Sequence, residues 1–224
     1  MGRRLANGSA SVSLLIHYQD AHLVVVEKPH GLPTQGTRRS DDNHLYQHVL
    51  ERFPRAALHH RLDTPASGLV LFTIDPAANR GIAAAFRSHT IDRRYIAVLA
   101  GDPGGEGTWS TPLDGRAARS HYRRLGEANG MSVVEVHLET GRTHQIRRHA
   151  ALAGHPIIGD RRHGGVAGRL WPRLALHAAG LSLRHPLSGA DLKVSSELPE
   201  DLLELVQPLA PALARQCTPA RAVD

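Results

Sequence analysis

A compact polar cluster stands directly before an apolar run in the first third of the chain. His60, Arg61 and Asp63 come first, residues 64–68 contain turn-forming Pro, Ser and Gly, and residues 69–72 are apolar. An apolar run of this length, bounded by turn residues, is typical of a buried strand. A carboxylate at such a place could act as a base or a nucleophile at neutral pH. The pattern therefore predicts a polar site at the mouth of a strand.

Residue type alone gives Asp63 three ordinary explanations. It could pair with Arg61, form an Asx turn into Pro65, or cap the N-terminus of a helix. A second polar stretch changes the balance. Residues 141–149 read Gly-Arg-Thr-His-Gln-Ile-Arg-Arg-His, and residues 154–160 read Gly-His-Pro-Ile-Ile-Gly-Asp. Two long motifs in a fixed order are far more specific than a lone tripeptide.

Together these stretches resemble the HRLDxxTSG and GRTHQIRxH…GHPIxGD motifs of the RluA-type pseudouridine synthases. The resemblance extends over residues 14–205, and it includes residues 28–33, similar to the KPxGLPV segment, and residues 94–98, similar to KxYxAxV. Two positions depart from the motif: Thr64, where many members carry a basic residue, and Ala66, where Thr is usual. The first could alter RNA contacts, and the second removes a hydroxyl.

The resemblance implies an α+β fold, the pseudouridine synthase catalytic fold. This fold has a mostly antiparallel mixed sheet, flanking helices and a central active-site cleft, and the chain has no room for the small S4 domain of many relatives. The implied activity is an isomerisation in RNA, which breaks the N1–C1′ bond of a uridine, turns the base and rejoins it through C5 without a cofactor. Because a base inside a helix is unreachable, it must be flipped out at a cost of a few kcal/mol.

Three catalytic residues follow from the resemblance: Asp63, Tyr95 and Arg147. Asp63 is expected to act on the sugar, and the sequence leaves open whether it attacks C1′ or removes a sugar proton. Arg147 is expected to pair with Asp63 and orient it, where the alternative is an ordinary surface arginine on a helix. Tyr95 is expected to stack on the uracil and is a candidate base for the C5 proton, where the alternative is a half-buried strand tyrosine.

The resemblance also implies a set of RNA-binding residues. Arg61 resembles the residue that enters the RNA stack where the target base leaves it, and its alternative is a salt bridge to Asp63 or another acid. The other residues expected to contact RNA are His60, Arg142, His144 and Lys28.

Composition agrees with a polyanionic partner. The net charge is +6, and all but two of the 27 basic residues are Arg, which binds phosphate bidentately and stacks on bases. Aromatic residues make up only 4% of the chain, which argues against a platform that stacks many bases and for a pocket that holds one. The RNA could be tRNA or rRNA, and we slightly favour tRNA at this point.

Two alternative functions come from other classes. The sixteen histidines suggest a metal-dependent hydrolase as one alternative. The sequence has no HExxH motif, however, and the lone Cys217 cannot form a cysteine zinc site, so no metal is expected. A non-catalytic RNA-binding module is the other alternative, and Asp63 argues against it because a pure binder has no use for an acid in a phosphate-binding cleft.

Other features of the sequence bear on the cellular compartment and the oligomeric state. A single cysteine cannot form an internal disulfide, and the chain has neither a signal peptide's apolar region nor a membrane-length apolar run. We therefore expect a cytoplasmic protein without a membrane partner. We also expect a monomer.

The chain is expected to form one domain over residues 13–206, which by the resemblance is the catalytic domain, with a disordered leader over 1–12 and a disordered tail over 207–224. Asp42 and Thr143 are expected to cap two of the helices, and residues 101–107 are expected to form a flexible loop. The expected strands cover residues 14–18, 23–27, 69–73, 94–100, 120–125, 132–138 and 174–183. The expected helices cover residues 43–53, 76–88, 143–153 and 199–206.

Overall fold

A computed structural model describes residues 13–36 and 43–216 of the 224-residue chain. The strands are β1 (Ile16–Gln19), β2 (Leu23–Lys28), β3 (Ala57–Leu58), β4 (Ser67–Thr73), β5 (Asp92–Ala100), β6 (Glu106–Trp109), β7 (Ser120–Ala128), β8 (Met131–Leu138), β9 (Leu176–Arg184) and β10 (Asp191–Ser195). The helices are α1 (Leu45–Arg52), α2 (Pro76–Arg87), α3 (Gln145–Leu152), α4 (Glu200–Val206), α5 (Pro211–Gln216) and the 3-10 turn η1 (Ala167–Arg169).

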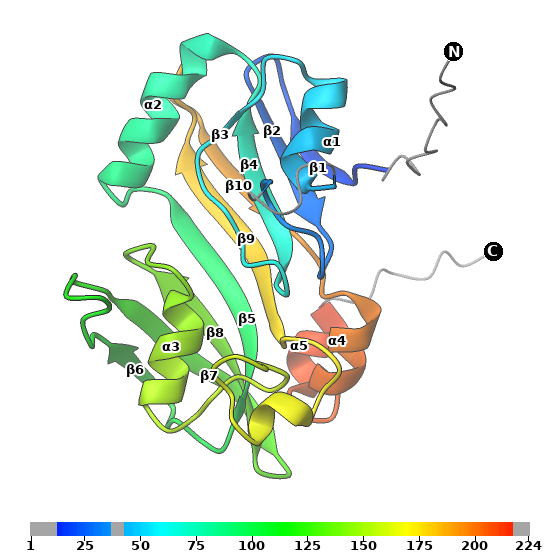
Figure 1. Cartoon of the computed structure of the whole chain (residues 1–224), viewed down its shortest axis with the longest axis vertical. Helices are drawn as coiled ribbons and strands as arrows, with labels where there is room; N and C mark the ends of the chain where they lie inside the picture. Colours follow the sequence, from blue (N-terminus) through cyan, green and yellow to red (C-terminus); the bar gives the residue numbers. More distant parts are fainter. Residues whose placement is uncertain (1–12, 37–42, 217–224) are drawn as a thin grey trace, which may run out of the picture.

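The strands within the described residues form one sheet in the order β1-β2-β4-β9-β5-β8-β7-β6, with β10 beside β9 and β3 beside β4. β4 and β9 pair in parallel, and the other paired strands are antiparallel. Figure 1 shows β1–β4 with α1 and α2 in the upper part and β6–β8 with α3 in the lower part, joined by β5 and β9. The α+β class with a mostly antiparallel sheet is confirmed.

Alternation along the strands divides the core into two clusters on opposite faces of the sheet. Val24 and Val26 of β2 pack in the larger cluster, which also contains Val49 of α1. Their neighbours on β2 point the other way, into a cluster that contains Ile82 of α2. Successive side chains of a strand point to opposite faces, so the mainly apolar run of β2 gives both α1 and α2 a surface to cover.

The predicted disordered tail is wrong for residues 207–216. This segment continues from α4 into α5, and Leu209, Ala210 and Ala214 are buried at 5% exposure or less. Leu209 lies so close to Gly126 of β7 that a Cβ at Gly126 would come within 2.2 Å of the Leu209 carbonyl oxygen. The Pro-Ala-Arg-rich composition of this segment suggested disorder, but its short apolar pattern packs into the core. The leader, residues 1–12, and residues 217–224 lie outside the described residues.

The predicted helix caps also need correction. The side chain of His44 caps α1 by accepting from the Gln47 N–H, and Asp42 lies outside the described residues. Thr143 does not cap α3, because the helix starts after His144, whose backbone is left-handed with φ 53°. The sequence also gave no signal for the short strands β3 and β10, and β6 begins inside the expected flexible loop.

Candidate active site

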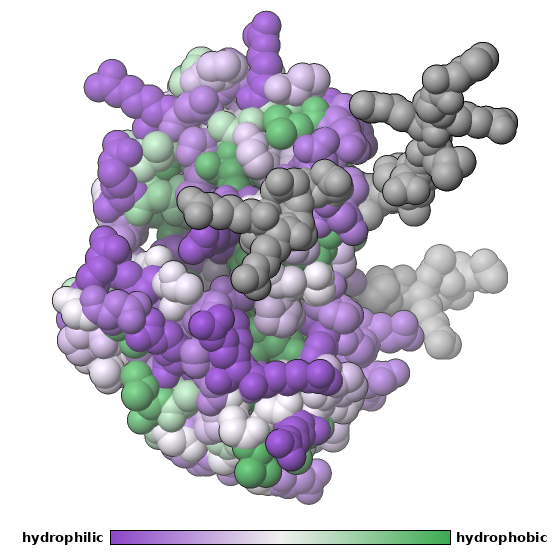
Figure 2. Space-filling view, in the orientation of Figure 1, coloured by the Kyte–Doolittle hydropathy of each residue, from purple (hydrophilic) through white to green (hydrophobic). Residues whose placement is uncertain are grey.

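A cleft of about 790 Å³ opens between the two parts of the sheet. Figure 2 shows a hollow in the surface between the upper and lower parts of the molecule, bordered by hydrophilic residues. The turn before β4 forms one wall, and the segment that leads into α3 forms the opposite wall. Of the residues predicted from the sequence, those that line the cleft are His60, Arg61, Asp63, Tyr95, Arg142, His144 and Arg147.

Asp63 and Arg147 meet in this cleft, as the motifs implied. Arg147 Nη1 donates to Asp63 Oδ2 at 2.9 Å. The Asp63 side chain keeps 23% of its surface exposed, whereas that of Arg147 keeps only 5%. The carboxylate is therefore open to a ligand from one side and held by a buried guanidinium from the other.

Asp160 fixes the position of Arg147. Its two oxygens accept from Arg147 Nε and Nη2 at 2.8 and 2.7 Å, so the pair is bidentate. Burial alone would raise the pKa of Asp160, but hydrogen bonds from Arg147 and from two backbone N–H groups outweigh it and hold that pKa below its usual value. The Arg147 guanidinium is shared between Asp160 and Asp63, so its planar fork leaves Asp63 Oδ2 little freedom.

Lys28 supports the turn that carries Asp63 and does not reach the cleft. Its side chain is fully buried, and Nζ donates to the carbonyl oxygens of Pro29, Leu32 and Thr64 at 2.9, 2.8 and 3.2 Å. Burial lowers the pKa of Lys28 to about 7, although the negative charge of Asp63 acts to raise it. The prediction that Lys28 binds RNA is therefore not supported, because an ammonium enclosed in this way cannot touch a phosphate.

The far end of the same turn is held by Arg173. Its Nη1 donates to Ser67 Oγ at 3.1 Å, while Nε and Nη2 bind the carboxylate of Asp201 in α4. The next residue, Gly68, has φ +116°, and a Cβ there would lie 2.4 Å from the Ala178 carbonyl oxygen. Only glycine allows the parallel approach of β4 to β9 at this point.

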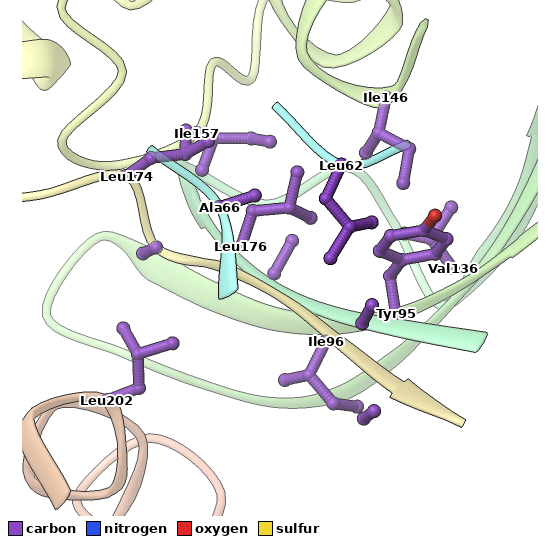
Figure 3. Close-up of a cluster of buried hydrophobic side chains, with 14 of the residues drawn as sticks. Leu62, Ala66, Tyr95, Ile96, Val136, Ile146, Ile157, Leu174, Leu176 and Leu202 are labelled. Carbon is purple, nitrogen blue, oxygen red and sulfur yellow. The ribbon is translucent and has the colours of Figure 1, made fainter. Parts of the chain in front are cut away.

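Tyr95 lies on β5 beneath the cleft. Figure 3 shows its ring beside Leu62 and Val136, in the cluster that also contains Ile146. The residue is 7% exposed, and burial raises the pKa of its phenol. Within the described part of the chain the hydroxyl has no hydrogen-bond partner, so the ring is fixed by packing and the oxygen is available to a ligand.

Comparison with known proteins decides the family. A family model described as RNA pseudouridylate synthase matches residues 22–152. Ribosomal large subunit pseudouridine synthase D of Zymomonas mobilis is 33% identical over 88% of this chain and 73% of its own length, and its Pseudomonas aeruginosa counterpart is 35% identical over 87% and 71%. The solved structure of human RNA pseudouridylate synthase domain containing 1 is 26% identical, with a TM-score of 0.72 and 87% of both chains covered.

The chain belongs to the RNA pseudouridylate synthase family. It is an RNA pseudouridine synthase, an isomerase, and neither the metal-dependent hydrolase nor the non-catalytic RNA-binding module is favoured. None of the helices in the described residues is long and apolar enough to cross a membrane.

The residues expected to bind RNA differ in whether their side chains already have partners within the fold. His60 is committed to the fold: its ring stacks on Phe86 with centroids 4.9 Å apart, and Nε2 accepts from the Leu71 N–H at 2.8 Å. Burial lowers the pKa of His60 to about 3, so the ring is a neutral wall of the cleft. Arg61 is exposed, and Arg142 lines the cleft while its Nε donates to the Ala117 carbonyl oxygen.

Sequence reasoning missed several residues of the synthase site. Arg87 and Arg93 also line the cleft, and the run Arg93-Arg94 beside Tyr95 was the signal that could have found one of them. Asp160 stood at the end of the second motif without an assigned role. His163 lies behind His144, and no pattern in the sequence pointed to it.

Proposed function

We propose that this synthase isomerises a uridine of large-subunit ribosomal RNA, with Asp63 as the residue that acts on the ribose. The support is the geometry of Asp63, a carboxylate exposed to a cleft of about 790 Å³ and held from behind by the buried Arg147. The relatives in two bacteria are named for the large ribosomal subunit. That name favours rRNA over the tRNA preferred from the sequence, and it favours the cytoplasm as the compartment.

The other roles follow from position. Arg147 orients Asp63, and Tyr95 lies under the flipped base with its oxygen free to approach C5. Because burial raises the pKa of the phenol, the hydroxyl must first give up its own proton before the oxygen can take the one on C5. Arg61 is exposed at the cleft wall and fills the gap that the flipped uridine leaves in the stack. Residues of this chain form both walls of the cleft, and we propose that the synthase acts as a monomer.

Replacement of Asp63 tests the proposal. Asp63→Asn keeps the size of the side chain but removes the carboxylate, so we expect RNA binding within about twofold of the parent and no pseudouridine in nucleoside analysis. Asp114→Asn is the matched control, because Asp114 is an exposed acid that pairs with Arg148 outside the cleft. Appreciable isomerisation by Asp63→Asn would disprove the assignment.

Tyr95→Phe separates stacking from proton transfer. The variant keeps the ring, so binding should be unchanged, but a positioned proton transfer contributes ~10²- to 10⁴-fold, and we expect at least a ~100-fold slower single-turnover rate. A rate within a few-fold of the parent would reduce Tyr95 to a stacking surface.

Mapping identifies the RNA. Pseudouridine mapping in cells with and without the gene should show the loss of a modification in large-subunit rRNA. A loss confined to tRNA would leave the activity in place and contradict the substrate.

A further inference from the structure

Two histidines meet at the edge of the cleft. His144 Nδ1 lies 2.9 Å from His163 Nε2, and the two rings meet edge to face at 73° with centroids 5.2 Å apart. His144 holds a left-handed backbone conformation at φ 53°, which non-glycine residues adopt rarely and only where the surroundings fix it. This geometry orients the His144 ring toward Asp63, whose Oδ1 lies 3.9 Å from its Nε2.

His163 is tied to the ion pair behind Asp63. Its backbone N–H donates to Asp160 Oδ1 at 3.1 Å, the same oxygen that accepts from Arg147 Nη2. The segment that carries His163 is therefore placed by the group that places Arg147. The histidine pair and the Asp63–Arg147 pair form one connected assembly.

A single proton must lie between the two rings. Burial lowers the pKa of His144 and of His163, and the positive charges of Arg147 and Arg162 lower both further. A nearby carboxylate acts in the opposite direction on each ring: Asp63 on His144 and Asp160 on His163. Both rings are therefore neutral near pH 7, and a neutral imidazole has one donor and one acceptor nitrogen. If His163 Nε2 carries the proton and donates it, His144 Nδ1 is the acceptor and His144 Nε2 must carry its own N–H. That tautomer points a donor at Asp63, whereas the opposite one would set a lone pair against a carboxylate.

The gap between His144 and Asp63 fits one oxygen atom. Asp63 Oδ2 is occupied by Arg147, so Oδ1 is the oxygen left for a ligand. A separation of 3.9 Å is too long for a direct hydrogen bond, but an oxygen placed about 2.8 Å from both atoms bridges it. Such an oxygen accepts from an N–H and donates to a carboxylate, which only a hydroxyl or water does.

We propose that His144, held in its Nε2–H tautomer by His163, forms with Asp63 a binding site for the 2′-hydroxyl of the target ribose. This inference rests on the proposed function, since it places the target nucleotide over Asp63. Within an RNA strand the 3′ and 5′ oxygens are esterified, so the 2′-hydroxyl is the free hydroxyl of the ribose. The same hydroxyl distinguishes RNA from DNA. His144 touches the substrate in this arrangement, and His163 is a positioning residue.

The first test reads the tautomer without any RNA. In ¹⁵N NMR of the intact protein, His144 should show a protonated Nε2 and an unprotonated Nδ1. His163→Phe keeps a ring of similar size but removes the donor, so His144 should become a mixture of tautomers. A parent protein with the proton on His144 Nδ1 would overturn the proposal.

The second test uses two RNAs that are already isomerised. The hairpin identified by mapping is synthesised with pseudouridine or with 2′-deoxypseudouridine at the modified position, and dissociation constants are measured for both. The preference for the hydroxyl-bearing RNA should fall about fivefold in His163→Phe, the effect of one hydrogen bond. His163→Gln keeps an N–H donor and should restore most of the preference.

Controls separate this result from misfolding and from failure of the proposed function. His121→Phe replaces an exposed histidine of β7 that pairs with Glu139 away from the cleft, and it should leave the preference unchanged. A preference that stays within twofold of the parent in His163→Phe would overturn the proposal. Failure of the proposed function would appear instead as isomerisation by Asp63→Asn, and neither measurement here requires isomerisation.

Discussion

Two arginines hold the two ends of the turn that carries Asp63, and they do so with the same three nitrogens. Arg147 binds Asp160 through Nε and Nη2 and gives Nη1 to Asp63. Arg173 binds Asp201 through Nε and Nη2 and gives Nη1 to Ser67. We call these arrangements the front clamp and the rear clamp.

The clamps differ in what the third nitrogen holds. The front clamp ends on the carboxylate of Asp63, whose side chain is 23% exposed. The rear clamp ends on the hydroxyl of Ser67, a residue that is 1% exposed. The exposure of the acid that holds each arginine shows the reverse order. The side chain of Asp160 in the front clamp has no exposed surface, whereas that of Asp201 in the rear clamp is 44% exposed. One guanidinium geometry therefore positions a reactive group at one end and anchors the start of a strand at the other.

Replacement of Arg147, the arginine of the front clamp, should have the largest effect on stability and activity. Arg147→Met leaves the buried Asp160 without a charge partner, which typically costs about 3–5 kcal/mol of unfolding free energy, and it also releases Asp63. We expect urea unfolding to show a loss of this size and activity to disappear. Arg173→Met should lose less stability, because water reaches Asp201. Equal losses in the two variants would remove the distinction between the clamps.

Lys28 lies between the clamps and allows a test of how the turn is supported. Lys28→Met keeps the length of the side chain but removes the donor to three carbonyl oxygens, so we expect a loss of about 2–4 kcal/mol in urea unfolding. Lys193→Met is the matched control on an exposed lysine and should change stability by less than about 0.5 kcal/mol. A Lys28 variant of normal stability but weakened RNA binding would restore the role predicted from the sequence.

Acid should loosen the rear clamp through His177. Its Nδ1 lies 3.0 Å from Ser67 Oγ, and burial, with Arg173 second, lowers its pKa to about 3 from the ordinary 6.5. The unfolded chain therefore binds this proton first, so the contribution of His177 is complete above about pH 6.5 and is lost as the pH falls toward 3. Urea unfolding between pH 7.5 and 4.5 should show stability falling faster in the parent than in His177→Gln, by up to ~1.4 kcal/mol per pH unit. Parallel curves would contradict this account.

The Asp63–Arg147 pair of the front clamp could be predicted from the sequence, whereas the role of Asp160 in that clamp and the whole rear clamp could not. Asp63 and Arg147 stand in contiguous motifs whose resemblance to a known family places them together. Arg173, Asp201 and Ser67 come from three separate segments with no shared pattern. The folded chain brings them to one place, where β4 pairs in parallel with β9 and α4 supplies Asp201.

Charge in a sequence does not show where a side chain points. Lys28, in the segment similar to KPxGLPV, was expected to bind RNA, yet it ends β2 with its ammonium turned inward. Thr143 has the type of a helix cap, but the left-handed backbone of His144 starts α3 one residue later. Strands with clear apolar patterns were found at nearly their observed bounds. β3 was missed because it has only two residues, and β10 because only Leu192 and Val194 of its five residues are apolar.

The most direct test compares the two acids that hold the clamps. Asp160→Asn and Asp201→Asn make the same chemical change at equivalent positions, and single-turnover rates are measured at a temperature where circular dichroism shows both variants folded. Asp160→Asn should slow isomerisation about 10- to 100-fold, because a small displacement of Arg147 misplaces Asp63. Asp201→Asn should stay within about twofold of the parent. Equal rate losses, or a larger loss in Asp201→Asn, would contradict the claim that the front clamp alone serves the chemistry.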